Sequence, residues 1–241
     1  MRSRCDYFLH IIDPEQMYGF GKRRAVLPWT RLVSAVLVLY IILFTVATDP
    51  DLYLLYATYW VTMLVFLYFV LVTVISFCQV YRPPPSVTLE RVAYVVYELA
   101  LPFSVTIDVG YWAAINPGGV FGGVDDEISS IQNHAGASFL ILIDFVLSDI
   151  VLHYRHVVFG FGFILFYLVV NATWTLSTGI PVYNILTWRS ATTAYYIIGV
   201  LVLFPIVYLP LAALTVKVRS WATRAEQKRP SSTLNDASSV L

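Results

Sequence analysis

The sequence predicts an all-α fold, a polytopic membrane helical bundle with six transmembrane helices and with N and C termini cytosolic. Composition is the first observation, since 59% of the 241 residues are hydrophobic and only 12% are charged, against about 25% charged in a soluble domain. The second observation is a set of six apolar stretches, each long enough for the roughly 20 residues that span a bilayer as a helix. The third is the one-sided placement of Lys and Arg.

The six predicted spans follow one another with short polar separators. They cover residues 28–48, 53–79, 92–115, 128–151, 156–178 and 192–217. The chain therefore divides into a cytosolic N-terminal segment (1–27), a six-helix transmembrane domain (28–218) and a cytosolic tail (219–241). The tail is polar and poor in apolar residues, which is typical of disorder.

Basic residues fix the orientation of the bundle. Those on one side of the six spans are Arg2, Arg4, Lys22, Arg23, Arg24, Arg31, Arg82, Arg91, Arg155, Lys217, Arg219, Arg224, Lys228 and Arg229. The other side has only Arg189, and its loops carry acidic residues such as Asp125 and Asp126. The positive-inside rule places the basic side in the cytosol. We expect an integral, multi-pass protein of the endoplasmic reticulum or the plasma membrane.

Several kinds of partner are not expected from the sequence. Acidic and basic residues balance at fifteen each, so no basic surface for nucleic acid is indicated. His-Glu-x-x-His, Gly-x-Ser-x-Gly and P-loop motifs are absent from the sequence, so we expect no metal and no cofactor. Membrane lipids are the expected partners, and the oligomeric state is not indicated.

Polar residues inside the predicted spans mark the candidate site, because such groups are costly in a bilayer and are often functional. At 1.5 Å rise per residue, Thr58, Asp108, His134 and Asn171 lie in one layer, about 8–10 Å below the outer face. A neutral imidazole can activate a hydroxyl as a nucleophile. Thr58 and His134 are therefore candidate catalytic residues, with Asp108 and Asn171 as supporting groups. A histidine that only packs between helices is the structural alternative.

A second polar layer lies nearer the cytosol. Asp144 is ten residues after His134 and Glu98 ten residues before Asp108, so each lies about 15 Å deeper. Arg31 enters the bilayer at that level. We expect a structural layer of neutralised charge formed by Glu98, Asp144 and Arg31.

Three parts of the chain resemble the rolling stone-like membrane proteins. The stretches that carry the resemblance are Tyr56-Ala57-Thr58-Tyr59-Trp60, then His134 with Leu140-Ile141-Leu142-Ile143-Asp144-Phe145, His156 and Tyr167, and then Pro181-Val182-Tyr183-Asn184-Ile185-Leu186-Thr187-Trp188. That group is similar to the androgen-induced membrane proteins, six-span threonine hydrolases that cleave fatty acid esters of hydroxy fatty acids. By motif position, the resemblance implies that Thr58 and His134 are the catalytic pair.

Three functions remain open at this point. The first is an intramembrane lipid-ester hydrolase with a Thr58 nucleophile and a His134 base. The second is a non-enzymatic membrane factor for adhesion, fusion or scaffolding, since rolling stone itself is associated with myoblast fusion. The third is a transporter or proton pathway, which the lack of sequence repeats disfavours.

Overall fold

A computed structural model describes residues 23–48, 50, 53–81 and 86–227. Within these ranges the chain is helical and has no strands, which confirms the predicted all-α class. Six helices in the described part are long and apolar enough to cross a membrane, as predicted. The protein is therefore a multi-pass integral membrane protein.

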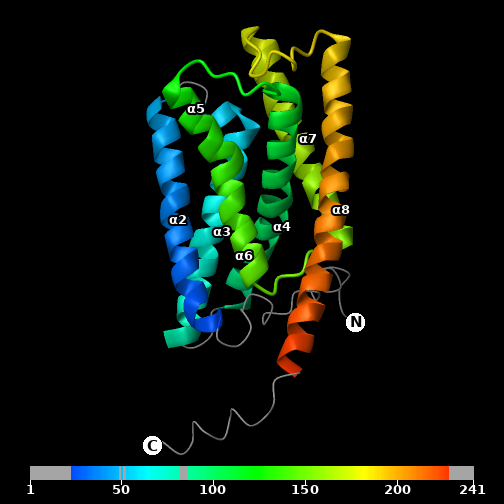
Figure 1. Cartoon of the computed structure of the whole chain (residues 1–241). Coiled ribbons are helices and arrows are strands. Elements are labelled where there is room, and N and C mark those ends of the chain that lie inside the picture. The colour runs from blue at the N-terminus through cyan, green and yellow to red at the C-terminus, as the bar shows by residue number, and fades with distance from the viewer. Residues whose placement is uncertain (1–22, 49, 51–52, 82–85, 228–241) are drawn as a thin grey trace, which may run out of the picture.

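The helices run alternately up and down the bundle (Figure 1). Their bounds are α2 Arg23–Thr48, α3 Ala57–Tyr81, α4 Val87–Gly110, α5 Val124–Ile131, α6 Ala137–Leu147, α7 Val157–Thr178 and α8 Ala191–Gln227. Short helical turns lie before, between or after these helices. The 3-10 turns are η2 Tyr53–Leu55 and η5 Tyr154–His156, and the π turns are η3 Tyr111–Ile115 and η4 Gln132–Gly136. The α5, η4 and α6 segments together form the fourth span.

The end of the bundle on the side of most basic residues is the inner end, and the opposite end is the outer end. The outer end carries η2, residues 116–123 and the loop 179–190, at the top of Figure 1. The inner end carries the start of α2, the end of α8 and residues 148–153.

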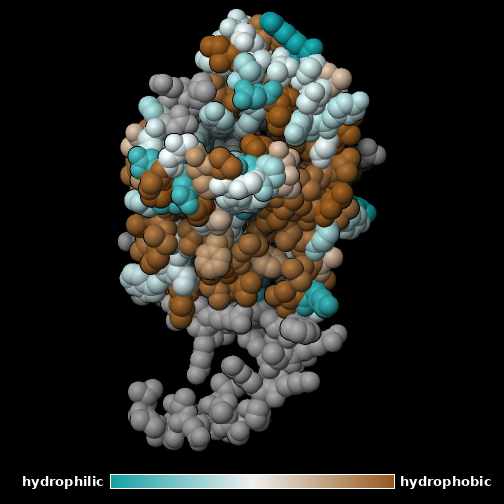
Figure 2. Space-filling model, turned by 45° about the horizontal axis from the view of Figure 1, so that its top comes forward, coloured by the Kyte–Doolittle hydropathy of each residue, from teal (hydrophilic) through white to brown (hydrophobic). Residues whose placement is uncertain are grey.

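The core lies between α2, α3, α4 and α6, and α4 is the most buried span. Tyr68 and Tyr97 fill its centre with ring centroids 5.0 Å apart. Helices α7 and α8 pack against this group mainly through α4 and expose most of their surface. Figure 2 shows apolar side chains over the flank of the molecule and paler, polar ones at the outer end. This distribution suits a lipid solvent around the flank.

The fourth span ends earlier than predicted. The prediction carried this helix to residue 151, whereas α6 ends at Leu147 and residues 148–153 are non-helical yet largely buried. Buried backbone groups need partners, and side chains supply them here. Tyr94 donates to the Val151 carbonyl at 2.8 Å, and Tyr208 donates to the His153 carbonyl at 2.9 Å. The irregular segment is therefore held inside the inner end of the bundle.

The helices that carry the first and last spans extend beyond those spans, while the parts long and apolar enough to cross a membrane, Val26–Thr48 and Ala191–Val218, lie close to the predicted ones. Helix α2 begins at Arg23, ahead of the predicted limit at residue 28, and α8 continues to Gln227, beyond residue 218. The rest of the predicted N-terminal segment and of the predicted tail lies outside the described residues.

Candidate functional site

Two π-helical turns meet at the outer end of the bundle. Turn η3 widens the end of α4, and turn η4 joins α5 to α6. Turns of this kind are rare and occur frequently at functional sites. His134 lies in η4, and its ring stacks on the ring of Tyr111 in η3 with centroids 3.6 Å apart and planes within 7°. The contact of two irregular turns at one histidine locates the candidate site.

His134 is held from several sides and lines a cavity. The residue is 8% exposed, and its carbonyl oxygen accepts a hydrogen bond from Trp112 Nε1 at 3.3 Å. Among the described residues no protein group bonds to its Nδ1. A cavity of about 440 Å³ adjoins the residue. The imidazole is therefore oriented by its stacking on Tyr111, and its Nδ1 is a buried nitrogen without a protein hydrogen-bond partner in the described chain.

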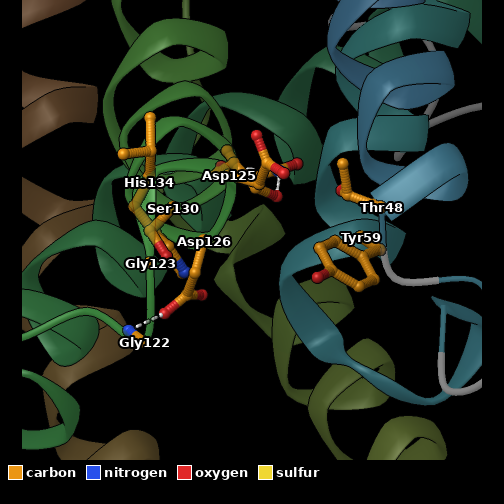
Figure 3. Close-up of a pocket in the computed structure, with 11 residues that line it drawn as sticks. Thr48, Tyr59, Gly122, Gly123, Asp125, Asp126, Ser130 and His134 are labelled. Carbon is orange, nitrogen blue, oxygen red and sulfur yellow. Dashed lines mark hydrogen bonds between the residues drawn. The ribbon is translucent and has the colours of Figure 1, made fainter.

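The cavity is polar and lies between α5–η4 and the outer ends of α2 and α3. Its lining residues are Thr48, Tyr59, Gly122, Gly123, Val124, Asp125, Asp126, Ser129, Ser130, Asn133 and His134. Figure 3 shows Asp125, Asp126, Ser130 and His134 on one side, with Thr48 and Tyr59 facing them. The two aspartates lie in the first turn of α5. A carboxylate in this position is stabilised by the positive end of the helix dipole. Asp126 also accepts a hydrogen bond from the Gly122 N–H at 2.8 Å.

Thr58 is buried at the same end but points to another group of residues. Thr58 is 7% exposed and is not among the residues that line the cavity. Its hydroxyl lies within interaction reach of the Tyr183 phenol, which also accepts the Ala57 N–H at 3.1 Å. Burial raises the pKa of Tyr183 to about 12. The phenol beside Thr58 is therefore a neutral hydrogen-bonding group at physiological pH.

Asn171 anchors the loop between α7 and α8. It is 1% exposed, its Oδ1 accepts from Trp188 Nε1 at 2.8 Å, and its Nδ2 donates to the Tyr167 hydroxyl at 3.3 Å. Trp188 has a φ of 58°, in the left-handed region that bulky residues rarely adopt. Its N–H donates to Thr193 Oγ1 at 3.1 Å. These bonds hold the strained tryptophan, so the structure gives Asn171 a role in loop conformation.

Thr62 and Asn133 link the helices that carry the two predicted catalytic residues. The Thr62 hydroxyl lies 3.1 Å from the Thr58 carbonyl oxygen and 3.2 Å from the Asn133 side-chain oxygen. Asn133 precedes His134, so the helix turns that carry the pair are neighbours. Among the described residues, however, no hydrogen bond joins the Thr58 and His134 side chains.

Among the described residues, neither of the predicted supporting groups is hydrogen-bonded to His134. Asp108 interacts with Ser138, which lies one helical turn deeper than His134 on the fourth span. Asn171 belongs to the Trp188 group described above. The predicted outer layer thus consists of neighbouring polar groups and not of one connected triad.

The inner charges form two pairs, whereas one cluster was predicted. Arg31 is fully buried, and its Nε donates to Asp144 Oδ1 at 2.8 Å. Tyr68 donates to the other oxygen of the same carboxylate. Glu98 lies apart from this pair, with its Oε2 2.6 Å from His156 Nδ1. The difference arises because Glu98 is bound by the segment before α7, where the His153 N–H also donates to its Oε1 at 3.2 Å.

Aromatic residues near the site have roles that the sequence did not indicate. Tyr111, Trp112, Tyr183 and Trp188 match the pattern of an interfacial aromatic belt, yet each contacts a candidate site residue. Asn133 directly precedes the intramembrane His134 in the sequence, and this adjacent polar residue was a signal that could have pointed to it. The π turns leave no mark in the apolar pattern, so the stacking on Tyr111 could not be predicted.

Comparison with known proteins adds no assignment. No protein-family model, curated protein or solved structure matches this chain. The resemblance to rolling stone-like proteins therefore stays a prediction from the quoted motifs.

Proposed function

We propose that this protein hydrolyses lipid esters at the outer end of the bundle, with Thr58 as nucleophile and His134 as general base. The observation that carries the proposal is the oriented, buried His134 ring, whose Nδ1 lacks a protein partner among the described residues beside a cavity. A neutral imidazole in such a position can accept a proton from a hydroxyl. The motif resemblance supports Thr58 as its partner.

The proposed reaction needs water as its only co-substrate. The Thr58 oxygen attacks the ester carbonyl carbon while His134 takes the hydroxyl proton. The carbon–oxygen bond to the alcohol then breaks, and His134 returns the proton to the leaving alkoxide. Water attacks the acyl-threonine with His134 again as base, which releases the fatty acid and restores Thr58.

The neighbours of Thr58 suggest how the intermediate is stabilised. A neutral hydroxyl beside the nucleophile can donate to the oxyanion of the tetrahedral intermediate, and the Tyr183 phenol has this position. The proposal requires the Thr58 hydroxyl to turn towards His134 when an ester binds, since the two do not bond in the described structure. Catalytic contacts are often loose before substrate binds.

Labelling with a fluorophosphonate probe and hydrolysis of a branched fatty ester test the proposal. We expect Thr58→Ala and His134→Ala to abolish both, and Thr58→Ser to keep part of both because serine retains the hydroxyl. Thr73→Ala is the matched control, since Thr73 is a buried threonine on the same helix, far from His134. Thr58→Ala protein with wild-type labelling and turnover would exclude this mechanism.

The competing function is a non-enzymatic membrane factor in adhesion, fusion or scaffolding. One observation favours it. The Thr58 hydroxyl interacts with Tyr183 and the Asn171 side chain accepts from Trp188, so both polar groups already have partners in the loop between α7 and α8 and need no substrate. Well-folded wild-type protein that neither labels nor hydrolyses any ester of a broad panel would favour this function.

A further inference from the structure

We infer that the outer loop 179–190 is a lid over Thr58, closed in this structure and latched to α7 by the bond between Trp188 and Asn171. The lid opens to admit a lipid ester and closes again before the reaction. The inference deepens the proposed function and rests on it for what the lid admits. The latch itself is argued and tested without any measurement of turnover.

The loop covers the residue that it would guard. It joins α7 to α8 at the outer end of the bundle (Figure 1). Tyr183 in this loop reaches Thr58 with its phenol and accepts the Ala57 N–H at 3.1 Å. Its ring also packs edge-on against the ring of Tyr56, with centroids 5.3 Å apart. Thr58 is only 7% exposed in this arrangement, so a bulky ester needs the loop to move before it can reach the hydroxyl.

Trp188 holds a backbone conformation that favours release. Its φ of 58° lies in the left-handed region, which is costly for a bulky residue. Such strain persists where surrounding contacts enforce it, and it is concentrated at ligand clamps and switch regions. The enforcing contacts are the bond from Trp188 Nε1 to Asn171 Oδ1 at 2.8 Å and the bond from its N–H to Thr193 Oγ1 at 3.1 Å. Loss of the indole bond would therefore let the backbone relax and the loop lift.

Few apolar side chains keep the loop closed. Within the loop, Val182 and Leu186 are the buried apolar residues, whereas Asn184, Arg189 and Ser190 are exposed. Segments with few buried apolar contacts open locally at a small cost in free energy, and active-site lids belong to this class. The polar latch is therefore a large share of what holds the loop in place.

The start of the loop can act as a hinge. Gly179 ends α7 at a φ of 74°, a conformation that glycine adopts readily. No described atom lies within 4 Å of a Cβ added at this position, and the neighbouring Thr178 and Ile180 are exposed. Hinges are a few loop or element-terminal residues that absorb large changes in φ and ψ. A rotation here would carry Tyr183 away from Thr58 while α7 keeps its place.

Proteolysis after Arg189 reports opening without any catalytic readout. Arg189 is exposed and is the one Lys or Arg on the outer side of the spans in the predicted topology. A bond in a folded loop is cut mainly from the opened state, and the rate follows the population of that state when closing is faster than cleavage. The measurement is the rate at which trypsin creates a new N-terminus at Ser190 in the full chain in nanodiscs, followed by mass spectrometry.

Two variants break the latch from opposite sides. Trp188→Phe keeps an aromatic ring and removes the indole N–H, and Asn171→Ala removes the acceptor of that N–H. We expect each to raise the cutting rate about tenfold, a usual effect of leaving one partner of a buried hydrogen bond unsatisfied. Because both changes remove the same bond, the double variant should be cut about as fast as the faster single variant.

Thr173→Ala is the matched control. Thr173 is exposed on α7, and its hydroxyl donates to the Val169 carbonyl of the same helix at 2.8 Å, so this variant should be cut as slowly as the wild type. If Asn171→Ala does not fold, the comparison of Trp188→Phe with Thr173→Ala decides. Wild-type cutting in both latch variants, a double variant whose effect is the product of the two, or faster cutting in Thr173→Ala would overturn the inference.

A non-hydrolysable ether analogue of the branched fatty ester connects the lid to the proposed function. At a concentration that inhibits hydrolysis, the analogue should slow the cut after Arg189 in the wild type, because it binds beneath the closed lid and stabilises it. Hydrolysis without this protection, or without any effect of the latch variants, would reject this inference alone. A latch that behaves as expected in protein that hydrolyses no ester would reject the proposed function alone.

Discussion

Gly160 lets α7 approach α8 closely. A Cβ atom at this position would lie far inside van der Waals contact of the Phe204 ring. Phe204 cannot move aside easily, because it is fully buried and stacks on Phe103 with centroids 4.5 Å apart. Interiors are packed too tightly to absorb such an overlap without strain. The absence of a side chain at residue 160 is therefore a requirement of the packing between these helices.

We predict that Gly160→Ala lowers the stability by about 1–3 kcal/mol, the usual cost of overpacking. Gly162→Ala is the matched control, since no described atom lies within 4 Å of its added Cβ and alanine favours helix by up to about 1 kcal/mol over glycine. The measurement is the thermal unfolding midpoint of each variant in detergent. A midpoint for Gly160→Ala at or above that of Gly162→Ala would contradict the packing argument.

At the scale of residues, the sequence predicted which polar groups are buried but not their partners. Thr58, His134, Glu98, Asp144 and Arg31 were all placed inside the bundle from hydropathy alone, and all are buried. Partners depend on how each helix is rotated and on irregular turns, which local hydropathy does not encode. For this reason the sequence did not predict that Tyr111 and Tyr183 belong to the candidate site.

Buried pairs of polar side chains, one of them an ion pair, connect helices that are far apart in the sequence. Arg31 and Asp144 join α2 to α6, and Glu98 joins α4 to His156 at the start of α7. Breaking a buried ion pair leaves one uncompensated charge, which costs more than the pair contributes. The first pair is therefore a polar link between α2 and α6 that is costly to break on one side.

We predict that Arg31→Met lowers the stability by about 3–5 kcal/mol, because Asp144 stays buried without its cation. Arg31→Met/Asp144→Leu should recover much of this loss, since the second change removes the stranded charge. Arg155→Met, at an exposed arginine, should change stability by no more than about 0.5 kcal/mol. Unfolding midpoints of the purified variants measure these differences, and a double variant as unstable as Arg31→Met would show that the pair is not the cause.

At the scale of elements, span positions were predictable and their irregularities were not. Hydropathy located all six spans because lipid requires long apolar helices. The π turns at 111–115 and 132–136 and the break at 148–153 lie in sequence that is compatible with regular helix. These features are decided by tertiary contacts such as the bond from Tyr94 to the Val151 carbonyl.

At the scale of the whole molecule, the even number of spans determines which loops share a side. The start of α2 and the end of α8 lie at the same end of the bundle (Figure 1). The opposite end carries Asp125 and Asp126, together with Arg189. The positive-inside rule assigns the first end to the cytosol, so the His134 cavity would open away from it.

The orientation is tested by glycosylation of inserted acceptor sites. We predict that a sequon within a flexible insert between Gly118 and Gly119 is glycosylated in cells, because the helix count and the basic residues place this loop outside the cytosol. The same insert after residue 84 should remain unmodified, as should the natural Asn171-Ala172-Thr173, since Asn171 is 1% exposed within α7. The measurement is the gel shift before and after endoglycosidase. The reverse pattern would place the cavity in the cytosol and would contradict the orientation derived from the basic residues.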